Sequence, residues 1–163
     1  MGKYTSRMML TWKAFHQLMV DQVWPASPTT GAIPVVYFGV ALKPEHEAVV
    51  VVGTPEKAAS EARVTNRSVE EQFVLQLRIV TELPGRTADE AFDRLGDLLD
   101  VAQGALRDPA TGRQTNTFCG QTPSYPVPGM VSWLVDGVRS QMYLTAAGVA
   151  GYAELDVLFK SRI

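Results

Sequence analysis

The side chains able to do nucleophilic chemistry are few and far apart in this sequence. The chain of 163 residues has one cysteine, Cys119, and two histidines, His16 and His46. A cysteine nucleophile needs a base beside it and a further group that orients the base, and Asn116 is the nearest orienting residue in sequence. Neither histidine is close to Cys119 along the chain. The pattern favours a small loop cysteine, and we expect no catalytic residue.

Metal, cofactor and acid–base sites are not indicated either. Glu45, His46 and Glu47 are of metal-ligand type, but adjacent residues point in different directions and no second histidine cluster completes a shell, so we expect a solvated turn. The glycines form neither of the two common phosphate-binding motifs. Asp97 and Asp100 fall on the polar face of a predicted helix. We expect no metal site, no cofactor and no enzymatic activity.

Composition limits the classes of partner. The chain has 15 basic and 17 acidic residues, a net charge of -2, 46% apolar residues and 20% charged residues, as ordinary globular proteins do. The balance of charge argues against sequence-specific nucleic acid as the main ligand. No run approaches the roughly 18 apolar residues of a membrane span, so we expect no membrane partner. A single cysteine fits a reducing compartment.

The first elements follow from apolar spacing. Apolar residues at three- and four-residue intervals over 11–24, from Trp12 to Val23, predict a helix that ends at Trp24-Pro25. The runs 33–42 and 48–52 are rich in Val, Tyr, Phe and Ile and are separated by the polar residues 43–47. They predict two strands that form a hairpin.

A polar arm and a second helix come next. Residues 53–71 are polar, and from 73 to 80 apolar side chains alternate with others, which predicts a half-covered strand. Thr87 and Glu90 form a capping box that opens a helix, and Asp108-Pro109 ends it. The predicted buried face holds Ala91, Leu95, Leu98, Ala102 and Leu106. The other face holds Arg94 and the acidic residues.

The last part of the chain predicts a long loop and more strands. Residues 108–129 are rich in Gly and Pro, and so long a connection is usually functional or ordered by a partner. Strands are predicted at 130–138 and 141–146, and a final one around 153–159. Taken together, these elements predict one α+β domain over 1–163. It consists of a mainly antiparallel sheet with two principal helices packed on one face.

This order of elements resembles the tail terminator proteins of long-tailed bacteriophages, the group of the minor tail protein U type. The resemblance rests on the amphipathic helix 12–23, the Val-rich segment 35–52, the polar arm, the strand 70–80, the capping box, the leucine-rich helix 95–106 and the C-terminal strands. It covers nearly the whole chain, through an order of elements and not through an invariant motif.

The resemblance implies a structural virion protein without catalysis. Members of the family form a ring, commonly of six copies, that caps the finished tail tube and joins it to the head connector. The implied partners are further copies of the chain, the tail tube protein and the head–tail connector protein. The implied place is the tail-neck region of the virion, after assembly in the host cytoplasm.

The contact residues are expected on the extended segments, because a ring-forming subunit needs such elements. We place the contacts on the arm 53–71 and the loop 108–129. Charge on or near these segments singles out Arg63, Arg67, Glu70 and Arg139 as partner-binding candidates, although each could equally be a simple solvated charge.

Three alternatives stay open from the sequence. The long, proline-rich loop 108–129 departs from the family layout and leaves room for another head–tail neck or connector protein. A small α+β enzyme or ligand-binding module would build its pocket from Cys119, His46 and the same loop. A tail-tube or baseplate subunit would polymerise or bind fibres instead of capping a tube.

Overall fold

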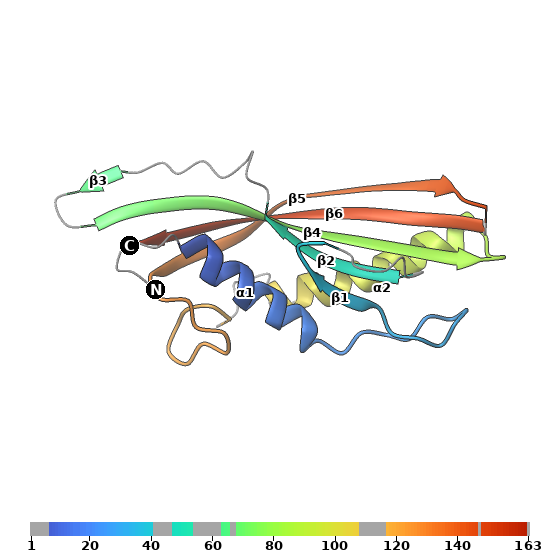
Figure 1. The fold of residues 1–163 in the computed structure, drawn as a ribbon, viewed down its shortest axis with the longest axis horizontal. Coiled ribbons are helices and arrows are strands. Elements are labelled where there is room, and N and C mark those ends of the chain that lie inside the picture. The colour runs from blue at the N-terminus through green and yellow to red at the C-terminus, as the bar shows by residue number, and fades with distance from the viewer. Residues whose placement is uncertain are drawn as a thin grey trace.

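Two helices lie on one face of a single sheet (Figure 1). The computed structural model describes residues 7–40, 47–53, 63–65, 68–107, 117–146 and 148–162. The elements in chain order are α1 (Arg7–Val20), β1 (Val35–Phe38), β2 (Glu47–Gly53), β3 (Arg63–Thr65), β4 (Ser68–Pro84), α2 (Ala88–Leu106), β5 (Met130–Leu144) and β6 (Gly148–Arg162). The α+β prediction is confirmed. Within the described ranges, no helix is long and apolar enough to cross a membrane.

The sheet has the strand order β1-β2-β4-β6-β5, and the short strand β3 pairs with the start of β4. Every pair is antiparallel except β1 with β2, which run parallel, so the predicted hairpin is wrong. The parallel arrangement requires the chain to run back along β1 before β2 begins. The four residues of β1 span about 13 Å, and the eight residues 39–46 can span about 26 Å, so this connection is long enough.

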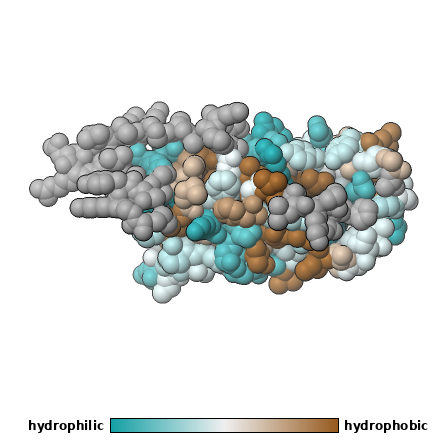
Figure 2. All heavy atoms as spheres, in the orientation of Figure 1, coloured by the Kyte–Doolittle hydropathy of each residue, from teal (hydrophilic) through white to brown (hydrophobic). Residues whose placement is uncertain are grey.

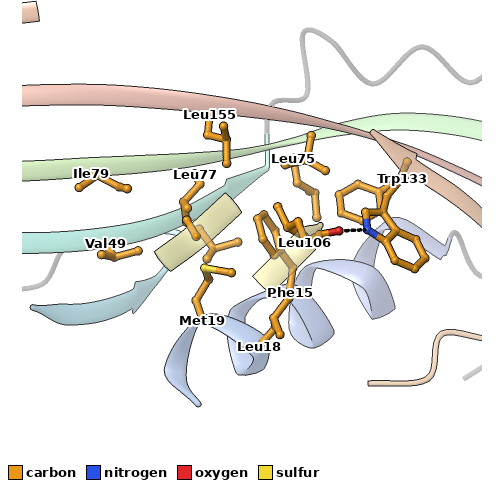
Figure 3. Close-up of a cluster of buried hydrophobic side chains, with 14 of the residues drawn as sticks. Phe15, Leu18, Met19, Val49, Leu75, Leu77, Ile79, Leu106, Trp133 and Leu155 are labelled. Atoms are coloured by element: carbon orange, nitrogen blue, oxygen red, sulfur yellow. Dashed lines mark hydrogen bonds between the residues drawn. The ribbon is translucent and has the colours of Figure 1, made fainter. Parts of the chain in front are cut away.

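The core lies between the helices and the inward faces of β2, β4, β6 and the start of β5. Phe73, Leu75, Leu77 and Ile79 of β4 alternate inward as predicted and are at most 1% exposed. They pair in register with residues of β6 that are fully buried, namely Phe159, Val157, Leu155 and Ala153. Figure 3 shows side chains of α1, among them Phe15 and Met19, pointing into this cluster. Alternation therefore places one apolar layer under both helices.

Helix α1 is shifted toward the N-terminus relative to the prediction. It ends at Val20, because side chains satisfy its last carbonyls: the indole of Trp24 donates to Met19 O at 2.8 Å, and Gln22 donates to Leu18 O at 2.9 Å. Val23, predicted on the buried face, is 91% exposed, since the chain has already left the helix.

Helix α2 begins at the predicted capping box. Glu90 N donates to Thr87 Oγ1, and Thr87 N donates to Glu90 Oε2. The five predicted inward residues are all buried. Arg94, predicted on the polar face, is only 4% exposed, because its guanidinium is paired with a carboxylate of β2. That carboxylate belongs to Glu47, which is buried within β2 and not part of a solvated turn.

The number of strands also differs from the prediction. Four strands precede α2, because the arm contributes β3, and two strands follow it. The two predicted strands, 130–138 and 141–146, are one continuous strand, β5, of 15 residues, which ends at Leu144. Its pairing with β6 is kept over this length by two register shifts, one between Val135 and Gly137, where a bulge absorbs an extra residue.

The second part of the predicted loop 108–129 is anchored in the core; residues 108–116 lie outside the described part. Phe118 is 1% exposed and meets the rings of Trp133 and Phe159 edge-on. Tyr125 and Val127 bond back to the backbone of Thr117 and Phe118. From the arm 53–71, residues 68–71 belong to β4, and 54–62 and 66–67 lie outside the described residues.

Candidate assembly surface at the sheet edges

The strand β5 forms one edge of the sheet along its whole length. Its first half is closed by side chains: Arg107 Nη2 donates to Val135 O at 3.3 Å, and the Cys119 thiol lies 3.9 Å from Val131 O. Over 136–144 no described element pairs with the outer side of the strand. Free strand edges of this length are templates for pairing with another chain, and soluble proteins usually shorten or charge them.

Apolar side chains accompany this open edge. On β5, Val138 is 43%, Tyr143 41% and Leu144 85% exposed. On α2, Phe92 is 59% exposed. Phe92 lies about 160° around the helix from Arg94, and Arg94 reaches toward β2, so Phe92 is on the flank of α2 that faces β5. By their register with β6, Val138 and Leu144 lie on the helix side of the sheet, whereas Tyr143 lies on the opposite face. We call Phe92, Val138 and Leu144, with the helix flank that bears Phe92, the α2–β5 surface.

The sheet face opposite the helices carries a polar network beside the same edge. Its centre is Glu154 of β6, which accepts hydrogen bonds from Arg139 Nη2 at 2.8 Å and from the Tyr152 hydroxyl at 2.6 Å. Burial and the bond to Glu154 raise the pKa of Tyr152 to about 12, so its hydroxyl stays a donor at neutral pH. A shallow depression of about 250 Å³ opens over Arg139, Tyr152 and Glu154.

The network continues across the sheet toward β4. The amide of Gln76 donates to Asp156 Oδ1 at 2.8 Å and to Glu154 Oε2 at 3.3 Å, and Arg78 Nε donates to Gln76 Oε1 at 2.7 Å. Gln76 is 3% exposed, although its side chain lies on the sheet face opposite the helices. The predicted contact residue Arg139 is therefore fixed to β6, yet its side chain is 63% exposed and available at the edge.

Glu70, a second predicted contact residue, lies at the far end of the sheet. Its carboxylate lies 3.4 Å from Lys160 Nζ and 3.3 Å from Arg162 Nε. Desolvation raises the pKa of Glu70, but the hydrogen bonds and charges of the two cations outweigh it and lower the pKa overall. The structure therefore does not bring Glu70 together with Arg139. Arg63 lies on β3 at that same far end, and Arg67 lies outside the described residues.

The opposite edge of the sheet, β1, is short and its backbone is partly occupied. Gly39 N–H points to β2, where it donates to Val51 O, so by alternation the backbone groups of Val36 and Phe38 point outward. The Phe38 carbonyl accepts from Val40 N–H at 2.9 Å, and the ring of His16 hydrogen-bonds the backbone of Val36.

Exposed apolar side chains surround this second edge as well. Phe38 stacks on Trp12 with ring centroids 4.9 Å apart, meets His16 edge-on at 5.3 Å, and remains 43% exposed. The exposed apolar side chains along this edge and the adjoining flank of α1 are those of Met9, Val20, Ile33, Val35, Phe38 and Val40. We call them the α1–β1 surface. Figure 2 shows apolar side chains gathered around the end of α1 and β1.

The surroundings of Cys119 do not resemble an activated nucleophile. Burial raises the pKa of the thiol, whereas a nucleophilic cysteine needs a lowered one. His16 packs against Phe38 of the β1 edge. Burial lowers the pKa of His16, and this effect outweighs the hydrogen bond to the Val36 backbone, which raises it. His46 and Asn116 lie outside the described residues. No cluster of three potential metal ligands occurs among the described side chains.

The apolar members of both surfaces were not predicted from the sequence. Phe92 was available as a signal, since it is a large apolar residue at a position that the helical period assigns to solvent. No protein-family model matches this chain, and no curated protein matches it.

Proposed function

We propose that this protein is a structural subunit that assembles into a closed ring and caps the tail tube of a long-tailed bacteriophage. The observation that supports this best is the open half of β5, a strand edge with Val138, Tyr143 and Leu144 exposed beside it. A chain that works as a monomer gains nothing from such an edge and risks aggregation. A subunit of an assembly uses it for contact.

The remaining parts of the proposal come from the order of elements. A ring at the tube end needs two further faces, one for the tail tube protein and one for the head connector, and the family resemblance supplies those partners. The polar network around Glu154 and Arg139 suits such a face, because it is rigid, charged and partly exposed. The work of the protein is then binding and positioning, in the neck of the virion.

The test is the mass of the purified protein in solution, alone and mixed with tail tube protein, by light scattering after size exclusion. Electron microscopy of the same mixture shows where the protein sits. A closed ring, or a monomer that joins tube ends only, supports the proposal. A fixed monomer or dimer that ignores the tube overturns it. The variant Cys119→Ala is the control, and it should assemble as the wild type does.

A further inference from the structure

Large exposed apolar side chains concentrate at the two opposite edges of the sheet. The α2–β5 surface lies at one edge and the α1–β1 surface at the other, with β2, β4 and β6 between them (Figure 1). Because they lie on opposite edges, one folded chain cannot cover one of these surfaces with the other. A second copy can, if its α1–β1 surface meets the α2–β5 surface of the first.

The charges of helices α1 and α2 are complementary, which favours the same contact between two copies. Helix α2 exposes the acidic side chains of Asp89, Glu90, Asp93, Asp97 and Asp100, while its one basic residue, Arg94, is buried. Helix α1 exposes Lys13 and contains no acidic residue, while its other basic residue, Arg7, is half-buried with its Nε enclosed. A contact between α2 of one copy and α1 of the next therefore pairs opposite charges around an apolar centre.

A two-fold contact is disfavoured by the same charges. If the α2–β5 surface met its own copy, the acidic faces of two α2 helices would approach each other, and like charges brought together across an interface cost free energy. If the α1–β1 surface met its own copy, Lys13 would approach Lys13. A head-to-tail contact avoids both and can close into a ring.

We propose that the α2–β5 surface of one copy docks on the α1–β1 surface of the next copy. This inference rests on the proposed function, which it deepens by naming the two faces of the subunit contact. Phe92, Val138 and Leu144 supply the apolar centre on one side, and Ile33, Val35 and Phe38 supply it on the other.

The test uses two variants that each lose one surface. Phe92→Asp/Leu144→Asp blocks the α2–β5 surface, and Ile33→Asp/Val40→Asp blocks the α1–β1 surface. All four side chains are more than half exposed, so the variants should fold, which circular dichroism checks. The control is Leu134→Asp on the closed half of β5, where the side chain is 52% exposed outside both surfaces.

Each blocked variant should need about tenfold more protein to assemble, or fail to assemble, because docking would bury unpaired carboxylates. Mixed together, the two variants should form a complex of two chains and stop there, since each still has the surface that the other has lost. Light scattering at the concentration where the wild type assembles, alone or on tube ends, reads this out. The control variant should assemble as the wild type does.

Two results would overturn the inference while leaving the proposed function intact. One is a wild type that forms rings while the mixture of variants stays monomeric; the other is a blocked variant that assembles as readily as the control. If the wild type neither assembles nor binds tube ends, the proposed function itself is overturned.

Discussion

Arg94 of α2 and Glu47 of β2 form a buried, two-pronged ion pair. Arg94 Nε lies 2.7 Å from Glu47 Oε2 and Nη2 lies 2.8 Å from Oε1, with both side chains at most 5% exposed. The Thr81 hydroxyl donates to the same carboxylate at 2.8 Å, and Arg94 also donates to Pro25 O at 2.7 Å. The pair thus joins α2 to β2, β4 and the segment after α1.

Removing the guanidinium should be severe. In Arg94→Ala the carboxylate of Glu47 stays buried without its cation, so the free energy of unfolding should fall by about 3–5 kcal/mol. Urea denaturation followed by circular dichroism measures this. Arg86→Ala, which breaks the exposed pair with Glu90, should change it by less than about 0.5 kcal/mol. Equal effects of the two variants would show that the buried pair does not hold α2 in place.

Gly129 should tolerate no side chain. Its φ is +81°, and a Cβ there would overlap the backbone carbonyl of Arg162, whose own N–H donates to Gly129 O at 2.7 Å. Gly129→Ala should therefore lower the free energy of unfolding by about 2–5 kcal/mol, through backbone strain and overpacking together.

Gly31 offers the matched control for this change. Its φ is +70°, but nothing lies within 4 Å of a Cβ built there. Gly31→Ala should cost only the left-handed backbone penalty of about 1–2 kcal/mol. Thermal and urea unfolding of the two variants compare them, and an equal cost would mean that the contact between Gly129 and Arg162 is easily relaxed.

Tyr125 ties the loop 117–129 to the end of α1 through a hydrogen bond from its hydroxyl to Asp21 Oδ2, 2.6 Å long. That bond, followed by one from Gln17, lowers the pKa of Asp21 below its ordinary 3.8, and it is the main cause that raises the pKa of Tyr125 to about 12. Tyr125→Phe should therefore raise the pKa of Asp21. Gln17→Ala should raise it less.

The sign of the pH dependence follows from the lowered pKa. Because the pKa of Asp21 is lower in the folded state, its contribution to stability is present above pH 3.8 and is lost as the pH falls through the lowered value. The stability difference between wild type and Tyr125→Phe should shrink over that range. Titration of the Asp21 carboxyl by NMR, with unfolding measured at neutral and acid pH, checks both statements; an unshifted pKa in the variant would contradict them.

Assembly should depend on salt and on Lys13. Exposed charges are screened within about 4 Å at 0.5 M salt against about 14 Å at 0.05 M, so added salt should weaken a contact that pairs α1 with the acidic face of α2. Lys13→Glu should weaken assembly at low salt, and Lys13→Gln should be intermediate. Light scattering over a salt series measures this, and assembly that strengthens with salt would leave the apolar centre as the only driving contact.

The parts of the fold that depend on local sequence were predictable. The alternation of Phe73, Leu75, Leu77 and Ile79 placed β4 with its buried face, and Thr87 with Glu90 placed the start of α2. Helical and strand periods, with capping chemistry, act over a few residues, so one sequence is enough to read them.

The sequence by itself determined the α+β class, the inward faces of α2 and β4, and the lack of a recognisable catalytic motif. Only the tertiary structure decided that β1 and β2 run parallel, that Arg94 is buried against Glu47, and that no described segment pairs with the outer side of the second half of β5. Each of these depends on which segments meet across the sheet. Whether a strand edge is paired, or an arginine is buried, depends on a segment that is distant in sequence and packs beside it, and no local pattern reports that.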